Sequence, residues 1–193
     1  MDLINLRNST LYYAAGMMAL NPIAWNILAQ VEYRWHLVST LFGNQKKVAC
    51  FATALLILFL NAIRTTLFHQ AIDEQPKLAH DSFFTDILAY LLIGIGQMFV
   101  WTSFYRLGFF ATFLGDYFGI FTLSEPVTAF PYSVCGDPMY WGSSISYLGY
   151  AVLERSMTGL VLTVVICIIY YLAILVESRM LYIIYSEKNK KGN

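Results

Sequence analysis

The chain has 193 residues, of which 58% are hydrophobic, 17% are aromatic and only 12% are charged, and its mean hydropathy is +0.57. This composition differs from that of ordinary soluble domains and indicates an integral membrane protein. Twelve Lys and Arg residues balance twelve Asp and Glu residues, so the chain lacks the basic surface that nucleic-acid binding requires. Cys50, Cys135 and Cys167 match no metal-binding or redox spacing, and we expect no metal site.

The first apolar segment, from Asn8 to Val31, carries no charge but contains Asn21, Pro22, Asn26 and Gln30. Polar side chains and a proline make it unsuited to face lipid along its whole length. The sequence predicts either a kinked span or a re-entrant helix here. Because the segment is longer than a signal-peptide core and no Lys/Arg cluster precedes it, we expect it to remain in the mature protein.

Three later stretches have the length and apolar character of membrane-spanning helices. They run from Val48 to Ile63, with an extension through Thr65 to Phe68, from Ile87 to Tyr105, and from Ser156 to Val176. The sequence therefore predicts an all-α fold, a polytopic bundle of four to five transmembrane helices, in one domain over residues 1–193.

The segment from Gly142 to Leu153 is apolar but, at 1.5 Å per residue, covers only about 18 Å, which is short of the hydrocarbon core. Ser156-Met157-Thr158-Gly159 follows it and is typical of a tight connection. We expect this segment and the last span to form a C-terminal helical hairpin. The hairpin would bring Asp137-Pro138 and Glu177 to the same membrane face.

The basic residues orient this arrangement. The hairpin leaves four of them opposite the C-terminal tail, namely Arg7, Arg64, Lys77 and Arg155, and puts four others on the side of the tail, namely Arg34, Lys46, Lys47 and Arg106. Together with the basic tail, this distribution predicts a cytosolic C-terminus. Lys190-Lys191 has the spacing of a dilysine retrieval signal of the endoplasmic reticulum, or forms a basic solvated tail, and both interpretations agree on the side.

Between the spans, residues Leu114 to Gly142 are rich in Gly, Pro, aromatic and acidic residues. Backbone of this irregular kind persists at membrane depth only where it is buried in protein or lines a cavity. The sequence therefore predicts that this run forms a wall of a functional site.

Several motifs of the chain resemble those of the phospholipid N-methyltransferases, which methylate phosphatidylethanolamine and its monomethyl and dimethyl forms to give phosphatidylcholine. The motifs are Leu114-Gly115-Asp116-Tyr117-Phe118-Gly119-Ile120, Val127-Thr128-Ala129-Phe130-Pro131, Asp137-Pro138-Met139-Tyr140-Trp141-Gly142-Ser143, Asn21-Pro22-Ile23-Ala24-Trp25-Asn26, Gln75-Pro76 and Thr158-Gly159-Leu160. The resemblance implies S-adenosyl-L-methionine as methyl donor and a phospholipid in the bilayer as acceptor. The expected location is the endoplasmic reticulum membrane, to which the dilysine spacing points, and in addition the mitochondrial membrane.

Two elements of that family are associated with the donor. Gly94-Ile95-Gly96 matches a Gly-x-Gly in the third span, and Glu177 matches the first of two glutamates that end the last span. Ser178 stands where the family has the second glutamate, although its hydroxyl still accepts a hydrogen bond. Without the resemblance, a Gly-x-Gly in an apolar helix indicates close helix packing.

The resemblance also places Pro138 and Tyr140 beside the cofactor. We expect aromatic faces to hold the sulfonium donor and the methylated amine by cation–π attraction, with anchoring at the membrane interface as the alternative, and the candidates are Tyr117, Phe118, Tyr140 and Trp141. Arg106 and Arg155 are expected to pair with the lipid phosphate, or else to extend their charges to the interface.

Methyl transfer to an amine requires the neutral amine, and a carboxylate or histidine that takes the proton assists it. Asp116, Asp137, Glu177 and the histidines His36, His69 and His80 are available. Asp116 is the predicted catalytic residue because it lies in the polar run beside Tyr117. A cap or turn role between Gly115 and Gly119 is the alternative.

Two other functions are compatible with the sequence. One is a small non-enzymatic membrane protein whose polar run is only a packed loop. The other is an isoprenylcysteine carboxyl methyltransferase, because that family is similar in its Pro-x-Tyr-x-Gly and terminal acid and uses the same donor on a different acceptor.

Overall fold

The computed structural model describes residues 3–78, 82–120 and 127–191, with side chains as far as residue 187. Within these ranges the chain forms helices and connecting loops, and its β-structure is limited to one isolated bridge between Lys77 and Ser156. The helices are α1 (Ser9–Trp35), α2 (Leu37–Leu41), α3 (Lys46–Asp73), α4 (Phe83–Thr112), α5 (Pro138–Leu153) and α6 (Met157–Lys191). The all-α prediction is confirmed.

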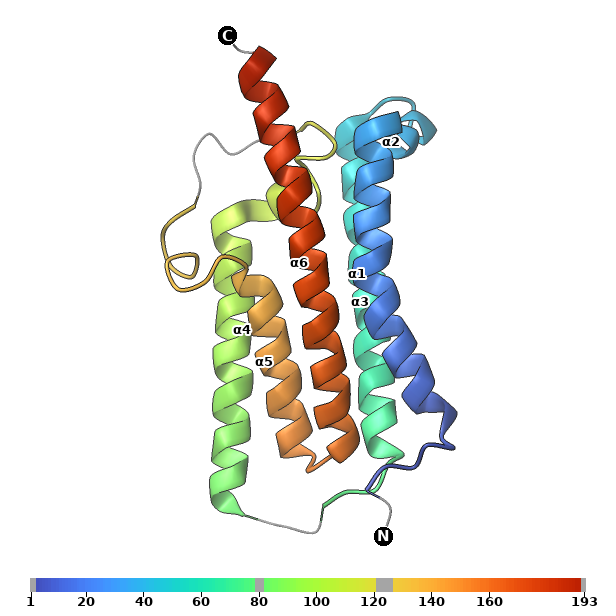
Figure 1. Cartoon of the computed structure of the whole chain (residues 1–193), viewed down its shortest axis with the longest axis vertical. Helices are drawn as coiled ribbons and strands as arrows, with labels where there is room; N and C mark the ends of the chain where they lie inside the picture. The colour runs from blue at the N-terminus through green and yellow to red at the C-terminus, as the bar shows by residue number, and fades with distance from the viewer. Residues whose placement is uncertain (1–2, 79–81, 121–126, 192–193) are drawn as a thin grey trace.

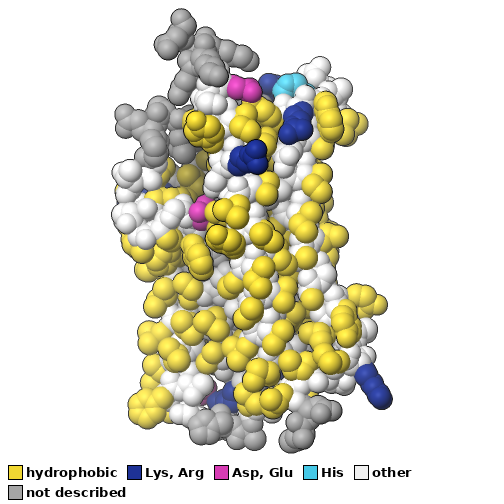
Figure 2. All heavy atoms as spheres, viewed as in Figure 1, with side chains coloured by type: hydrophobic (Ala, Val, Ile, Leu, Met, Phe, Trp, Pro, Cys, Tyr) yellow, Lys and Arg dark blue, Asp and Glu magenta, His cyan; other side chains and the backbone are white. Residues whose placement is uncertain are grey.

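The helices form an elongated bundle in which α1, α3, α4 and α6 run along the long axis, and the shorter α5 covers only part of it (Figure 1). Within the described ranges, α3, α4 and the Met157–Glu187 part of α6 are long and apolar enough to cross a membrane. On the face shown in Figure 2, hydrophobic side chains cover the middle of the molecule and Lys and Arg lie toward its ends. This distribution is the one that a membrane-spanning bundle requires.

The first apolar segment is a single helix through Pro22. It runs beside α3 along the long axis of the bundle, an arrangement that favours the kinked span over the re-entrant helix (Figure 1). The Asn21 side chain is fully buried and donates hydrogen bonds from Nδ2 to the Leu60 carbonyl and to Asn61 Oδ1, both at 3.2 Å. The polar residues of α1 are thus accommodated by contact with α3.

The predicted hairpin between α5 and α6 is confirmed, but its turn lies earlier than the sequence suggested. Arg155 adopts a left-handed conformation (φ 49°), and the Ser156 N–H donates to the Ala151 carbonyl at 3.0 Å. Ser156 Oγ then accepts from the Gly159 N–H at 3.0 Å, which satisfies an N–H at the start of α6. Ser156 to Gly159 therefore begins the helix instead of connecting the two.

Arg64 differs from the prediction. The sequence predicts that Arg64 faces the side opposite the tail, but α3 continues to Asp73 and Arg64 is inside it, only 8% exposed. By helix rise it lies about 13 Å before the last residue of α3. It is a buried cation within the bundle.

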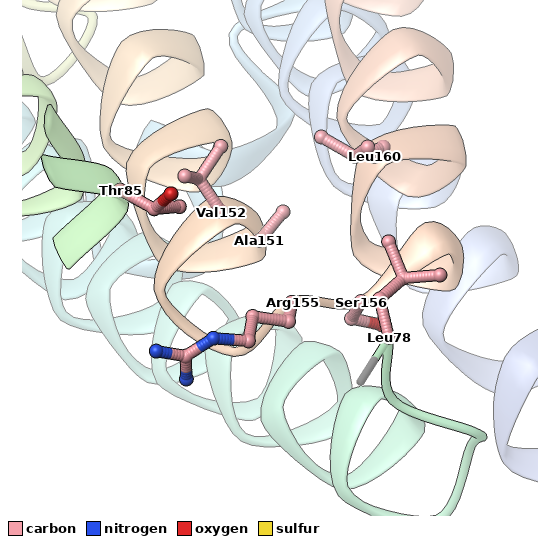
Figure 3. A pocket seen from close by; sticks show the side chains of 7 residues that line it. All are labelled: Leu78, Thr85, Ala151, Val152, Arg155, Ser156 and Leu160. Atoms are coloured by element: carbon pink, nitrogen blue, oxygen red, sulfur yellow. The ribbon is translucent and has the colours of Figure 1, made fainter. Parts of the chain in front are cut away.

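The end of the bundle at the hairpin turn is closed by polar contacts. Arg155 pairs with Asp86 at 2.8 Å, and its carbonyl accepts from the Leu78 N–H at 2.9 Å. Above these contacts lies a small, mainly apolar pocket of about 210 Å³, lined from α4, α5, α6 and the loop before α4 (Figure 3). Its lining residues are Leu78, Thr85, Ala151, Val152, Arg155, Ser156 and Leu160. This pocket lies at the end of the bundle that is away from the C-terminus.

The opposite end depends on a carboxylate that the sequence did not single out. Glu32, near the end of α1, is fully buried and accepts from the N–H groups of Val38 and Ser39 at 2.8 and 3.1 Å, and from the Ser39 hydroxyl. It satisfies N–H groups at the start of α2 that would otherwise lack partners. Glu32 therefore fixes the turn that leads from α1 to α3.

Candidate active site

The start of α5 meets the middle of α6 where the Tyr140 hydroxyl donates to Glu177 Oε2 at 2.8 Å. The ring of Tyr140 also packs against that of Tyr170, a residue of α6 that lies deeper in the bundle than Glu177. The two ring centroids are 4.9 Å apart and the ring planes make an angle of 62°. Because α5 begins partway along α4 and α6, this contact lies inside the bundle (Figure 1). The predicted convergence of the Asp137-Pro138 motif and Glu177 is therefore present.

Asp137 immediately precedes α5, and the fully buried Pro138 is the first residue of that helix. The Asp137 side chain is half-buried, and burial raises the pKa of its carboxyl. Burial likewise raises the pKa of the nearby Tyr132 hydroxyl to about 12. A hydrogen bond with Ser103 lowers this pKa, but the effect of burial is larger. This side of Glu177 is a poorly hydrated environment in which a carboxyl group retains its proton to higher pH than in water.

Tyr117 covers the site from the turn after α4. Gly108 breaks the helical conformation of α4 with φ 75°, which glycine adopts without steric cost, and the chain then crosses toward α6 (Figure 1). Tyr117 is buried with Met180 and Ile184 of α6. Burial and the carboxylates of Glu177 and Asp116 raise the pKa of its hydroxyl.

Asp116 is held farther along α6. Its Oδ1 accepts from the Tyr185 hydroxyl at 3.1 Å. Tyr185 follows Glu177 by eight residues, or about 12 Å of helix rise. This contact fastens the turn after α4 to α6, in keeping with the turn role considered for Asp116.

Arg106 holds the loop that leads to α5. Its Nε donates to the Phe130 carbonyl at 3.1 Å, and the Phe130 ring packs against Phe99 with centroids 5.6 Å apart. The guanidinium is exposed, so contact with a lipid phosphate stays a prediction.

Trp141 is 47% exposed on the surface of α5, and Ser178 is exposed on α6 beside Glu177. The side chains of Trp141 and Ser178 therefore do not take part in the contact between Tyr140 and Glu177.

The Gly-x-Gly of α4 lies at a helix–helix contact. A Cβ at Gly96 would lie 2.5 Å from the Gly142 carbonyl oxygen and 2.7 Å from the Ser146 nitrogen, whereas a Cβ at Gly94 would meet nothing within 4 Å. Gly94 and Ile95 are exposed, and Ile95 is 44% exposed. Gly96 thus packs against α5 about one turn below Pro138. Contact of the three residues with a methyl donor stays a prediction.

Known proteins resemble the chain over most of its length. The family model described as "Phospholipid methyltransferase" matches residues 84–188. Phosphatidylethanolamine N-methyltransferase of Mus musculus is 45% identical over 89% of this chain and 85% of its own length. The chain belongs to the phospholipid methyltransferase family. Phosphatidyl-N-methylethanolamine N-methyltransferases of Saccharomyces cerevisiae and Emericella nidulans are 36% and 35% identical, over 97% and 98% of this chain and 90% and 92% of their own.

No solved structure matches the chain significantly. Membership of a methyltransferase family makes this chain an enzyme that uses a methyl donor, and it overturns the alternative of a non-enzymatic membrane protein. The resemblance inferred from the motifs is confirmed.

The structure of this phospholipid methyltransferase family member adds residues that sequence reasoning missed. Tyr170 and Tyr132 contact or flank the Tyr140–Glu177 pair, although neither belongs to a motif. Tyr170 precedes Glu177 by seven residues, two turns of helix, so both lie on one face of α6. That spacing is the sequence signal for Tyr170.

We expect Gly96→Ala to destabilise the protein by about 1–3 kcal/mol, because the added methyl group overlaps the backbone of α5. Unfolding in detergent by denaturant or heat measures this change. Gly94→Ala is the matched control, since its methyl group enters open space and alanine favours helix. Equal stability of the two variants would contradict the packing role of Gly96.

Proposed function

We propose that this enzyme transfers a methyl group from S-adenosyl-L-methionine to the amine of phosphatidylethanolamine derivatives and so produces phosphatidylcholine. The mono- and dimethyl forms are the expected acceptors, and an assay decides whether the unmethylated lipid is accepted. The contact between Tyr140 and Glu177 supports this proposal above all others, because it joins the motif at the start of α5 to the glutamate that the family resemblance associates with the donor. The names of the relatives support the phospholipid acceptor over a prenylated cysteine.

The residues around this contact suit a cationic donor. S-adenosyl-L-methionine supplies a methyl group on a sulfonium. Tyr140 occupies one lone pair of the Glu177 carboxylate, which keeps further lone pairs for an ammonium or a ribose hydroxyl. The faces of Tyr117 and Tyr140 supply cation–π attraction in a poorly hydrated environment, where that attraction is strongest. In this scheme Gly94, Ile95, Gly96 and Ser178 are secondary donor contacts, and Trp141 and Arg106 contact the lipid.

The chain must also make the acceptor amine neutral. Apolar surroundings lower the pKa of an ammonium group and assist loss of its proton. Asp137 is better placed than Asp116 to receive that proton, because Asp137 adjoins the helix that carries Tyr140, whereas Asp116 bonds Tyr185 about 12 Å along α6. Since methyl transfer disperses charge between sulfur and nitrogen, positioning of the two reactants is the main task of the remaining residues.

The proposed location is the endoplasmic reticulum membrane, and in addition the mitochondrial membrane. A cytosolic C-terminus follows from the basic residues near the end where α6 finishes, and it gives the donor access to Glu177 from the cytosol. The side chains of Lys190-Lys191 and the last two residues lie outside the described part of the protein.

We expect purified protein in phospholipid micelles to transfer labelled methyl from S-adenosyl-L-methionine to monomethylated and dimethylated phosphatidylethanolamine. A panel of un-, mono- and dimethylated lipid, with a farnesylated cysteine methyl-acceptor as control, measures the preference. Absence of donor binding by calorimetry together with absence of label in lipid would overturn the proposed function.

Glu177→Ala should weaken binding of S-adenosyl-L-methionine more than Ser178→Ala does. Glu177 is half-buried and held by Tyr140, whereas Ser178 points to the outside of α6. Loss of a charge-assisted hydrogen bond corresponds to a fall in affinity of about tenfold or more. Calorimetry with both variants measures it, and an equal or reversed order would contradict the assignment of Glu177.

Asp137→Asn should lower kcat by about 100-fold and remove an inflection from the acidic side of the pH–rate profile. The carboxyl accepts a proton only when ionised, and burial raises its pKa, so the wild-type rate should rise with pH through that raised pKa. Asp116→Asn is the comparison and should keep the inflection. A profile altered by Asp116→Asn alone would return the catalytic role to Asp116.

A further inference from the structure

Arg64 is a buried cation that the proposed reaction does not use. It belongs to α3, a helix long and apolar enough to cross a membrane, and only 8% of it is exposed. A charged side chain at such a position is costly and marks a functional or strongly paired group. Among the described residues, no carboxylate forms an ion pair with Arg64, and its Nε has no hydrogen-bond partner.

Two tyrosines of the hairpin take the place of a counter-ion. The guanidinium carbon lies 5.6 Å from the ring centroids of both Tyr147 on α5 and Tyr170 on α6. Nη1 also donates to the Tyr170 hydroxyl at 2.7 Å. A planar guanidinium can contact two aromatic faces and donate a hydrogen bond at once, which a lysine ammonium does less well.

Only one of these tyrosines leads to the candidate active site. Tyr170 packs against Tyr140, and the Tyr140 hydroxyl donates to Glu177. Tyr147 instead packs against Phe68, and its hydroxyl lies 3.4 Å from Thr65 Oγ1. A continuous series of contacts therefore runs from Arg64 through Tyr170 and Tyr140 to the carboxylate.

We propose that Arg64, acting through Tyr170, is a positioning residue for the donor site. The hydrogen bond from Arg64 fixes the Tyr170 ring, which in turn restricts the Tyr140 ring to the orientation that lets its hydroxyl hold Glu177. Ground-state contacts of this kind affect affinity for the donor, because the carboxylate is prepared before the donor arrives. The inference rests on the proposed function, since it needs Glu177 to contact the donor.

Tyr170→Phe and Tyr147→Phe are a matched pair, since each removes one hydroxyl from a ring beside Arg64 and leaves the ring in place. We expect Tyr170→Phe to weaken binding of S-adenosyl-L-methionine about fivefold by calorimetry, with a parallel rise in KM and a kcat within about twofold of wild type. Tyr147→Phe should bind the donor within about twofold of wild type, while both variants lose similar thermal stability. Equal donor affinity in the two variants would overturn the inference.

A double-variant cycle separates this inference from the proposed function. In the Glu177→Ala background, Tyr170→Phe should cause no further loss of donor affinity, because the carboxylate that it positions is gone. A full additional fivefold loss in that background would overturn the positioning role and leave the proposed function intact. Wild-type affinity of Glu177→Ala itself would overturn the positioning role together with the assignment of Glu177, whereas the proposed function fails only if the wild-type protein neither binds the donor nor labels lipid.

Arg64→Lys and Arg64→Gln test the origin of the series. Lysine keeps the positive charge but lacks the planar guanidinium that bonds the Tyr170 hydroxyl while it contacts the rings of Tyr147 and Tyr170. We therefore expect the donor affinity of Arg64→Lys to lie between that of Arg64→Gln and that of the wild type. If Arg64→Gln melts at a much lower temperature and binds the donor as wild type does, the role of Arg64 is structural and the inference is wrong.

Discussion

The backbones of α4 and α5 touch because glycines stand at successive contacts between them. A Cβ at Gly142 would lie 2.6 Å from the Gly96 carbonyl oxygen, and one at Gly149 would lie 2.8 Å from the Ile93 nitrogen. In lipid, where apolar burial drives helix association only weakly, such close van der Waals packing is the main attraction available. It fixes the depth at which α5 begins. That depth decides which residue of α6 Tyr140 meets, so the position of the whole site follows from the packing of two helices.

Anionic side chains lie near the start of α5, around the contact between Tyr140 and Glu177, whereas a cationic side chain lies deeper in the bundle. Carboxylates, Asp137 and Glu177, gather with aromatic side chains at the start of α5, which suits a site for sulfonium and ammonium groups. Deeper in the bundle, Arg64 lies between tyrosine rings. Tyr170 contacts Arg64 and Tyr140 contacts Glu177, so the two tyrosines connect the regions, and none of the ion pairs of the described residues joins Arg64 to Glu177. Glu177 thereby remains available to a ligand.

The sequence predicted most of the architecture, because span length and the position of charges report directly on a membrane bundle. It predicted the hairpin from the shortness of Gly142 to Leu153, and the meeting of Asp137-Pro138 with Glu177 follows from the hairpin. Features that depend on partners distant in the chain were missed or misplaced. Arg64 resembled a span end because a charge normally ends a span, and only the tyrosines of the hairpin explain its burial. The pattern Gly94-Ile95-Gly96 is compatible both with close helix packing and with contact to a ligand, so the sequence alone does not distinguish these two roles.

The 16 residues of α5 extend for about 24 Å, whereas the 30 of α4 extend for about 45 Å. The carboxylate at the start of the shorter helix therefore lies well below the end of the longer one (Figure 1). A lipid headgroup normally rests at the water interface. In the proposed reaction it must descend toward the donor beside Glu177 while its acyl chains stay in the bilayer. On that proposal, the acceptor amine meets a less aqueous environment than the headgroups of neighbouring lipids in the same leaflet. The proposed reaction should then depend on bilayer thickness, because the thickness sets how far the headgroup must descend.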